Sequence, residues 1–169
     1  MGMRSEDVAE VLDRPISREL LTSGIPARLA YVARDGTPRA IPIGFHWDGA
    51  EFVLWTSENA AKVPALEAHP QVALTIDTNG FPPHVLLVRG VAALEAFDGV
   101  PDDYFRTASV DEQHRPAWEA EVRSLYRRMV RIGVTPEWVK LLDFETTLPS
   151  AVEELARQRE QGATNVVDD

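Results

Sequence analysis

Two hydroxyl side chains and a lysine lie close together in the segment WTSENAAK, where Thr56 and Ser57 precede Lys62. Hydroxyl groups, a lysine ammonium and the free N–H groups of a helix start all donate hydrogen bonds to anions. Three or four such donors, at roughly 1.5–3 kcal/mol for each charge-assisted bond, would hold a phosphate monoester. The chain has only two lysines, Lys62 and Lys140, among 17 basic residues. The segment therefore predicts an anion site, although a lone lysine is more often a solvated surface charge.

A second cation, Arg39, is expected to reach the same place from the preceding strand. Three runs of β-type residues cover 27–33, 37–47 and 50–56, with Asp35-Gly36 and Asp48-Gly49 between them. Asp-Gly between apolar runs is a strong hairpin signal, because both residues tolerate the positive φ of a tight turn. The pattern predicts an antiparallel meander that brings Arg39 and Lys62 together.

The rest of the chain adds helices to this sheet. The first helix is predicted from Ser5, its N-cap, to Pro15, where it ends. Further helices are predicted over 57–69, with Ser57 as N-cap, over 101–132 and over 150–160. Further strands are predicted over 71–77, over 84–97 with a bulge or bend at Gly90, and over 137–146. Within 101–132, one buried helical stripe is indicated by Trp118, Val122, Leu125, Met129 and Ile132. Four arginines near the end of that helix read as a solvated face: Arg123, Arg127, Arg128 and Arg131.

These elements predict one domain that is mainly β with flanking helices, built on six antiparallel strands. A chain of 169 residues with 44% hydrophobic content can bury a single core. We expect an N-terminal helical segment at 1–24, a barrel domain at 25–146 with a helical insertion at 101–132, and a C-terminal helix with a frayed tail at 147–169.

The composition of the chain excludes several classes of partner and site. A net charge of −10 disfavours nucleic acid and anionic membranes as partners, so the expected ligand is a small molecule. The absence of cysteine excludes disulfides and thiolate metal sites, and fits the cytoplasm. No apolar run approaches the roughly 18 residues of a membrane span. The four histidines show no metal-binding spacing, and the pairs Asp102-Asp103 and Glu153-Glu154 read as exposed, so no metal and no catalytic residue is assigned.

The segment RAIPIGFHWDGAEFVLWTSENAAK, residues 39–62, followed by HPQVALTID, resembles the pyridoxamine 5'-phosphate oxidase-like flavoproteins. This FMN-binding split-barrel group also includes deazaflavin-dependent reductases. The shared order is an Arg-led apolar strand, a hairpin, an aromatic-Thr step, a small-residue turn, a Lys and a His-Pro-x-Val strand. The likeness covers about residues 28–94.

The resemblance implies a six-stranded antiparallel split β-barrel that forms a homodimer, with FMN at the subunit interface. Arg39 and Lys62 would then hold the FMN phosphate together with Thr56 and Ser57. The backbone of Ile41 and Pro42 would line the flavin ring, and Trp55 takes the family's aromatic position.

Some positions depart from the family pattern. A second basic residue before the lysine is Ala61 here, a basic position on the Arg39 strand is Gly44, and a cofactor-binding Gln is Val85. The C-terminal Arg and His motif of the oxidases is not visible in EWVKLLDF, where Trp138 and Lys140 could instead reach a partner subunit's pocket. A true pyridoxamine phosphate oxidase is therefore not expected, and the substrate is not assigned.

Four interpretations follow from these residues. The first is an FMN-dependent oxidoreductase, in which the flavin carries the hydride chemistry. A deazaflavin-dependent reductase is the second, although its acidic tail would need more positive charge than Arg39 and Lys62 supply. The third is a non-catalytic flavin- or haem-binding protein, with His46 or His84 as a haem ligand. The fourth is a dimer of the same fold without a cofactor.

Overall fold

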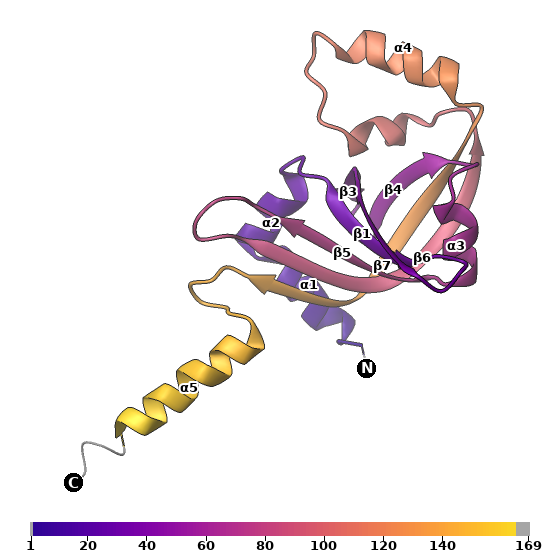
Figure 1. Cartoon of the computed structure of the whole chain (residues 1–169). Coiled ribbons are helices and arrows are strands. Elements are labelled where there is room, and N and C mark those ends of the chain that lie inside the picture. The colour runs from indigo at the N-terminus through magenta and orange to yellow at the C-terminus, as the bar shows by residue number, and fades with distance from the viewer. Residues whose placement is uncertain (1, 165–169) are drawn as a thin grey trace.

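The computed structural model describes residues 2–164 of the chain, and most of the predicted frayed tail lies outside this range. It consists of one curved antiparallel sheet with helices at its sides (Figure 1). The helices are α1 (Ser5–Asp13), α2 (Pro15–Thr22), α3 (Lys62–Ala68), the 3-10 helix η1 (Asp102–Thr107), α4 (Arg115–Leu125) and α5 (Ser150–Thr164); the strands are β1 (Ala27–Val32), β2 (Pro38–Ile43), β3 (Phe45–Trp47), β4 (Phe52–Ser57), β5 (Gln71–Asp77), β6 (Val85–Asp98) and β7 (Arg128–Leu142).

The sheet has seven strands in the order β2-β1-β5-β6-β7-β4-β3, with every neighbouring pair antiparallel. Six strands were expected, because residues 37–47 read as one strand; the structure divides them at Gly44 into β2 and β3. These two strands lie at opposite edges of the sheet and do not pair with each other, so the sheet is curved but not closed. A Cβ at Gly44 would lie 2.1 Å from the Thr107 carbonyl oxygen, which explains a glycine at this break.

The main core fills the inner face of the sheet. Alternate residues of β5 are buried, namely Val72, Leu74 and Ile76, as expected for a strand with one covered face. Leu20 of α2 and Leu66 of α3 pack into the same core. Each fully buried Leu or Ile contributes roughly 1.5–3 kcal/mol to folding, so this alternation fixes which face of each strand points inward.

The two longest strands, β6 and β7, form a hairpin whose ladder shifts register between Arg89 and Gly90. The bulge predicted at Gly90 is therefore confirmed. A Cβ at Gly90 would lie 2.2 Å from the Thr135 carbonyl oxygen, so only glycine lets the strands approach this closely. The hairpin is connected by residues 99–127, which we call the insertion segment.

The prediction of a single helix over 101–132 was wrong. The insertion segment contains η1 and α4, and Met129 and Ile132 instead lie on β7, which starts nine residues before the strand predicted at 137. Met129 packs in a cluster under the insertion segment and Ile132 in the main core, on opposite sides of the sheet. A strand buried on both faces has a continuous apolar run, and such a run can imitate helical periodicity. Only Arg123 of the four arginines is on a helix.

Helix starts were also predicted in the wrong places. Pro15 does not end the first helix but begins the second, as a proline at the first helical position can. Ser5 is inside α1, after Arg4, and no side chain caps this helix. The helix predicted from Ser57 begins at Lys62, with Ala61 preceding it. Each serine lies at or near the start of a helix, but neither is its N-cap.

The two faces of the sheet are covered unequally. The insertion segment covers the outer face of β4 and the start of β7, where Trp55, Phe105, Val122 and Met129 form a second apolar cluster. The outer face of β1, β2 and β5 is open within the described chain. Helix α5 extends away from the sheet (Figure 1), and its side chains from 150 to 161 are exposed. None of the described helices is long and apolar enough to cross a membrane.

Candidate functional site

The lysine that begins the small helix contacts one of the two predicted hydroxyl groups. Lys62 is the first residue of α3, and its Nζ donates to Thr56 Oγ1 over 3.0 Å. Thr56 is buried on β4, and Lys62 is half-buried. The short loop between strand and helix brings together two residues that are six positions apart.

The positive charge of Lys62 is not paired with any carboxylate of the described residues. Most arginines of the chain pair with a carboxylate, whereas within residues 2–164 the Lys62 ammonium has Thr56 as its hydrogen-bond partner and no ion pair. Burial lowers the pKa of Lys62 from the value of 10.5 of an exposed lysine. An ammonium has three N–H donors, so two remain for a ligand. A bound anion would offset the cost of partly burying this charge.

Arg39 lies on β2 opposite Tyr31 of β1, near the turn between these strands. It is exposed, and its Nη2 is 3.4 Å from an Asp35 carboxylate oxygen. Because α3 contacts β1, Arg39 and Lys62 belong to neighbouring parts of the fold, but no described hydrogen bond joins them. An exposed ion pair is worth only about 0–1 kcal/mol, so a phosphate could draw Arg39 away from Asp35.

Ile41 and Pro42 are on the same outermost strand. The Ile41 side chain is half-buried against the main core, and Pro42 is exposed opposite Arg28. An edge strand leaves some backbone groups unpaired. Backbone groups on the free edge of β2 are thus open to a ligand without rearrangement of the core, although Pro42 itself has no N–H to donate.

Trp55 and Ser57 are separated from the pair of Thr56 and Lys62. Successive side chains of a strand point to opposite faces, so Trp55 and Ser57 lie on the side opposite Thr56. Trp55 is 6% exposed beneath the insertion segment, where its ring packs edge-on against Phe97 at a centroid distance of 5.3 Å. Ser57 lines a hollow next to Arg128. The structure therefore brings together only part of the predicted set.

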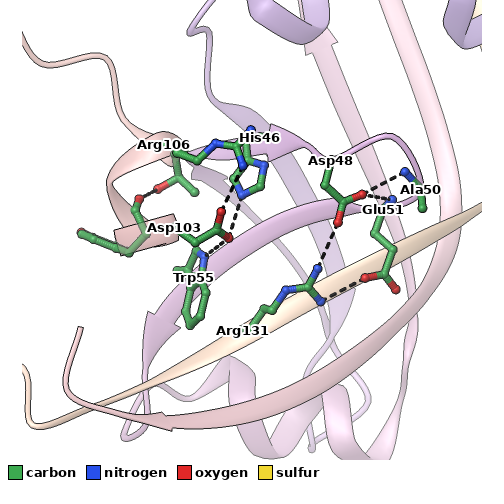
Figure 2. A network of polar contacts seen from close by, with 10 residues as sticks. His46, Asp48, Ala50, Glu51, Trp55, Asp103, Arg106 and Arg131 are labelled. Carbon is green, nitrogen blue, oxygen red and sulfur yellow. Dashed lines mark hydrogen bonds and ion pairs between the residues drawn. The ribbon is translucent and has the colours of Figure 1, made fainter. Parts of the chain in front are cut away.

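A polar cluster centred on Asp103 was not predicted from the sequence. Figure 2 shows three side chains meeting its carboxylate: His46 Nε2 at 2.8 Å, Trp55 Nε1 at 3.3 Å and Arg106 Nη1 at 3.3 Å. Burial alone would raise the pKa of Asp103, but the bonds from His46 and Trp55 and the charge of Arg106 hold it below its usual range. Asp103 thus fastens the insertion segment to β3 and β4. Its place in the pair Asp102-Asp103 suggested only an exposed acid.

A second polar cluster closes the turn between β3 and β4. Arg131 Nη1 lies 3.0 Å from a Glu51 carboxylate oxygen, and its Nη2 lies 3.3 Å from Asp48 (Figure 2). The Asp48 carboxylate also accepts the backbone N–H groups of Ala50 and Glu51. Arg131 was interpreted as part of a solvated helix face, and it is instead a structural residue of β7.

A family model for pyridoxamine 5'-phosphate oxidase matches residues 16–143. This span includes the seven predicted site residues and the whole sheet up to the end of β7. The chain belongs to the pyridoxamine 5'-phosphate oxidase family. The resemblance read from the sequence is thereby confirmed.

Solved structures of similar fold belong to proteins with different descriptions. An F420 reductase is 24% identical, with a TM-score of 0.52, over 73% of this chain and 94% of its own. General stress protein 26 from Bacillus anthracis is 15% identical, with a TM-score of 0.57 over 80% and 94%. The haem storage protein HutZ from Vibrio cholerae is 18% identical, with a TM-score of 0.54 over 76% and 92%. Among curated proteins, none matches this sequence. At these identities the likeness concerns the pyridoxamine 5'-phosphate oxidase fold alone.

The insertion segment explains one departure from the family pattern. At Gly44, where the resemblance places a basic residue, the Thr107 carbonyl occupies the space that a side chain would need. Any residue with a Cβ would displace the end of η1. The missing cation at this position is thus coupled to the packing of the insertion segment on the barrel.

The two histidines considered as haem ligands are placed differently. His46 is 8% exposed, its Nε2 is bonded to Asp103, and its Nδ1 is buried without a hydrogen-bond partner. Haem ligation by His46 would therefore require the insertion segment to move. His84 lies just before β6, half-buried, with its backbone N–H bonded to Thr78.

Proposed function

We propose that the chain is an FMN-dependent oxidoreductase acting on a small organic substrate. The observation that carries this proposal is the half-buried Lys62 ammonium, which donates to Thr56 and has no carboxylate partner among the described residues. Membership in the pyridoxamine 5'-phosphate oxidase family supports a flavin as its ligand.

Lys62 and Thr56 would hold the phosphate of FMN, and Arg39 would join them after leaving Asp35. Backbone groups of Ile41 and Pro42 on β2 would orient the ring. Ser57 and Trp55 remain in the proposed set, but they face the insertion segment and would contact FMN only after a local rearrangement. Bound FMN would supply hydride chemistry, while the protein supplies anchoring and orientation.

We propose that the protein is a homodimer that uses the open outer face of its sheet. Many outward residues of this face are small or apolar, namely Ala30, Val32, Ala40, Ala73, Leu87 and Val91, while its charged residues include Arg89 and the ion pair of Arg28 with Asp77. An antiparallel sheet that faces water on one side normally carries polar residues there. A second copy packed on this face would explain the composition and would place the two β2 strands near the interface.

Pyridoxamine 5'-phosphate is not assigned as the substrate. The basic residues expected at positions 44 and 61 are Gly44 and Ala61, and Thr107 fills the space beside Gly44. The substrate is proposed only as a small molecule that exchanges a hydride with the flavin.

Visible absorbance spectroscopy tests this proposal. The purified protein is expected to show a flavin spectrum, or to develop a saturable one on titration with FMN. Deazaflavin and haem would be titrated in parallel. Binding of deazaflavin or haem without binding of FMN would replace the proposed cofactor, and binding of none of the three would favour a fold without a cofactor.

The affinity for FMN should fall at high pH. Lys62 must be protonated to bind a phosphate, and burial lowers its pKa, so binding should be lost at a lower pH than 10.5. A Lys62→Arg variant keeps its charge at every accessible pH and should extend binding to higher pH. Titrations of FMN fluorescence between pH 7 and about 10.5 measure this. An unchanged affinity over that range would contradict a role for the ammonium.

A further inference from the structure

The end of the sheet from which α5 extends carries most of the exposed apolar side chains of the described chain. Six large apolar side chains are exposed among residues 2–164, and four of them belong to this end: Phe81, Phe144, Val152 and Leu155. The first lies in the loop between β5 and β6, and the other three follow β7. Because Val85 at the start of β6 pairs with Leu142 at the end of β7, the loop and the segment after β7 lie at the same end of the sheet. We call these four side chains the end patch.

Two loops hold phenylalanine side chains of the end patch at the surface. Phe81 is 99% exposed and is followed by two prolines. Phe144 has a φ of 59°, a left-handed conformation that a residue with a Cβ adopts only at an energetic cost. The Asp143 carboxylate fixes this turn by accepting the backbone N–H groups of the three residues that follow Phe144. Strained backbone of this kind is retained where it serves a function, which here is the display of an aromatic side chain.

Helix α5 has no surface covering its apolar stripe within residues 2–164. Its side chains from 150 to 161 are exposed, and Val152, Leu155 and Ala156 have the spacing of one helical face. An isolated helix of about 15 residues is only marginally stable in water, because most helical stability in proteins comes from the packing of an apolar stripe. Apolar side chains gathered at one place on a protein mark an interaction site. The helix therefore needs a surface to lie on.

The end patch is continuous with the open outer face of the sheet. Lys140 pairs in the ladder with Leu87, an outward residue of that face, and its Nζ donates over 2.9 Å to Ser150 Oγ at the start of α5. The loop that carries Phe81 joins β5 to β6, so it also begins at this face. A second copy of the chain packed on the open outer face would thus meet the end patch as well.

The charges around the stripe also favour a second copy. Lys140 and Arg89 on the outer face have no ion pair among residues 2–164. Glu153, beside Val152 at the edge of the stripe, accepts the backbone N–H of Leu148 and has no ion pair within the same range. The helix of one copy can therefore supply a carboxylate to the cations of the other, in a chain whose net charge of −10 otherwise opposes self-association.

We propose that α5 is an arm that lies on a second copy of this chain, with Val152 and Leu155 against the partner and with Phe81 and Phe144 at the edge of the same contact. Two-fold symmetry makes the exchange reciprocal, so each copy supplies one arm and receives one. The proposal rests on the homodimer proposed above and adds to it a contact outside the sheet. No flavin is needed for this contact.

Sedimentation velocity of the full chain over a series of concentrations tests the arm. We expect Leu155→Ser to raise the dissociation constant of the dimer by about tenfold or more, because each copy loses a buried leucine at the contact. Leu125→Ser is the matched control, since Leu125 at the end of α4 is 67% exposed and Leu155 is 64% exposed. This control removes the same side chain outside the end patch and should leave the dissociation constant unchanged.

Hydrogen exchange of the amides from 150 to 161 provides a second readout on the unaltered protein. A helix that lies on a partner exchanges slowly, whereas a lone helix of this length exchanges fast. Protection of these amides should be present at concentrations where the dimer prevails, and dilution should remove it together with the dimer.

The possible outcomes separate the arm from the homodimer and from the proposed function. A dimer that Leu155→Ser leaves unchanged, or one in which the α5 amides exchange fast, would overturn the arm and leave the homodimer standing. Equal weakening by the Leu125→Ser and Leu155→Ser variants would also overturn it, because a general loss of apolar surface would explain both. Protection that does not depend on concentration would place α5 on its own chain, and a monomer at every concentration would refute the arm and the homodimer together. A dimer that depends on Leu155, in a protein that binds no FMN, would support the arm and refute only the oxidoreductase.

Discussion

Replacing Lys62 by methionine is expected to weaken FMN binding by about 10- to 100-fold. Methionine keeps a long apolar side chain but removes the ammonium, whose charge-assisted bond to a phosphate is worth roughly 1.5–3 kcal/mol. Adding Arg39→Ala should abolish measurable retention of the flavin. Quenching of FMN fluorescence during titration measures both losses.

The other lysine of the chain provides the matched control. Lys140 donates to Ser150 Oγ over 2.9 Å near the start of α5, away from α3 in the sequence. Lys140→Met removes the same charge and should leave the affinity unchanged. An FMN affinity unaffected by Lys62→Met and Arg39→Ala together would show that the phosphate is not held here.

The second large effect is expected at Asp103, whose replacement by alanine should lower the free energy of unfolding by about 2–3 kcal/mol. The change leaves the donors of two buried side chains, His46 and Trp55, without their acceptor. Each unsatisfied buried polar group costs about 1–3 kcal/mol, less whatever water can replace. Chemical denaturation followed by circular dichroism measures the loss.

The neighbouring Asp102 is the natural comparison. Its side chain is 94% exposed and pairs with Arg123 at the surface. Asp102→Ala should cost less than about 1 kcal/mol, because exposed ion pairs contribute little. Equal losses for the two variants would mean that the Asp103 cluster does not fasten the insertion segment.

The sheet could be predicted from the sequence because its signals are local. Alternating apolar residues in β5 and the glycines of the two Asp-Gly turns indicate strands and hairpins without knowledge of the rest of the fold. Gly36 and Gly49 have the positive φ that was expected at the turns, although the aspartates do not. The contact between Lys62 and Thr56 was also partly predictable, because the two residues are close in sequence.

The strand β7 and the polar cluster around Asp103 could not be predicted from local patterns. Met129 and Ile132 have helical spacing, but they belong to a strand whose two faces are buried by different parts of the chain. The separation of Ser57 from Thr56 follows from strand alternation and could have been anticipated. The role of Asp103 depends on contacts with residues 48 and 57 positions away, for which a single sequence gives no signal.

The most direct test of the account compares the affinities of the unaltered protein for FMN and for riboflavin, which lacks the phosphate. If Lys62 and Thr56 hold the phosphate, FMN should bind at least about tenfold more tightly, and Lys62→Met should remove most of that difference. Equal affinity for the two compounds, or a preference that Lys62→Met leaves intact, would contradict the assignment of the phosphate site.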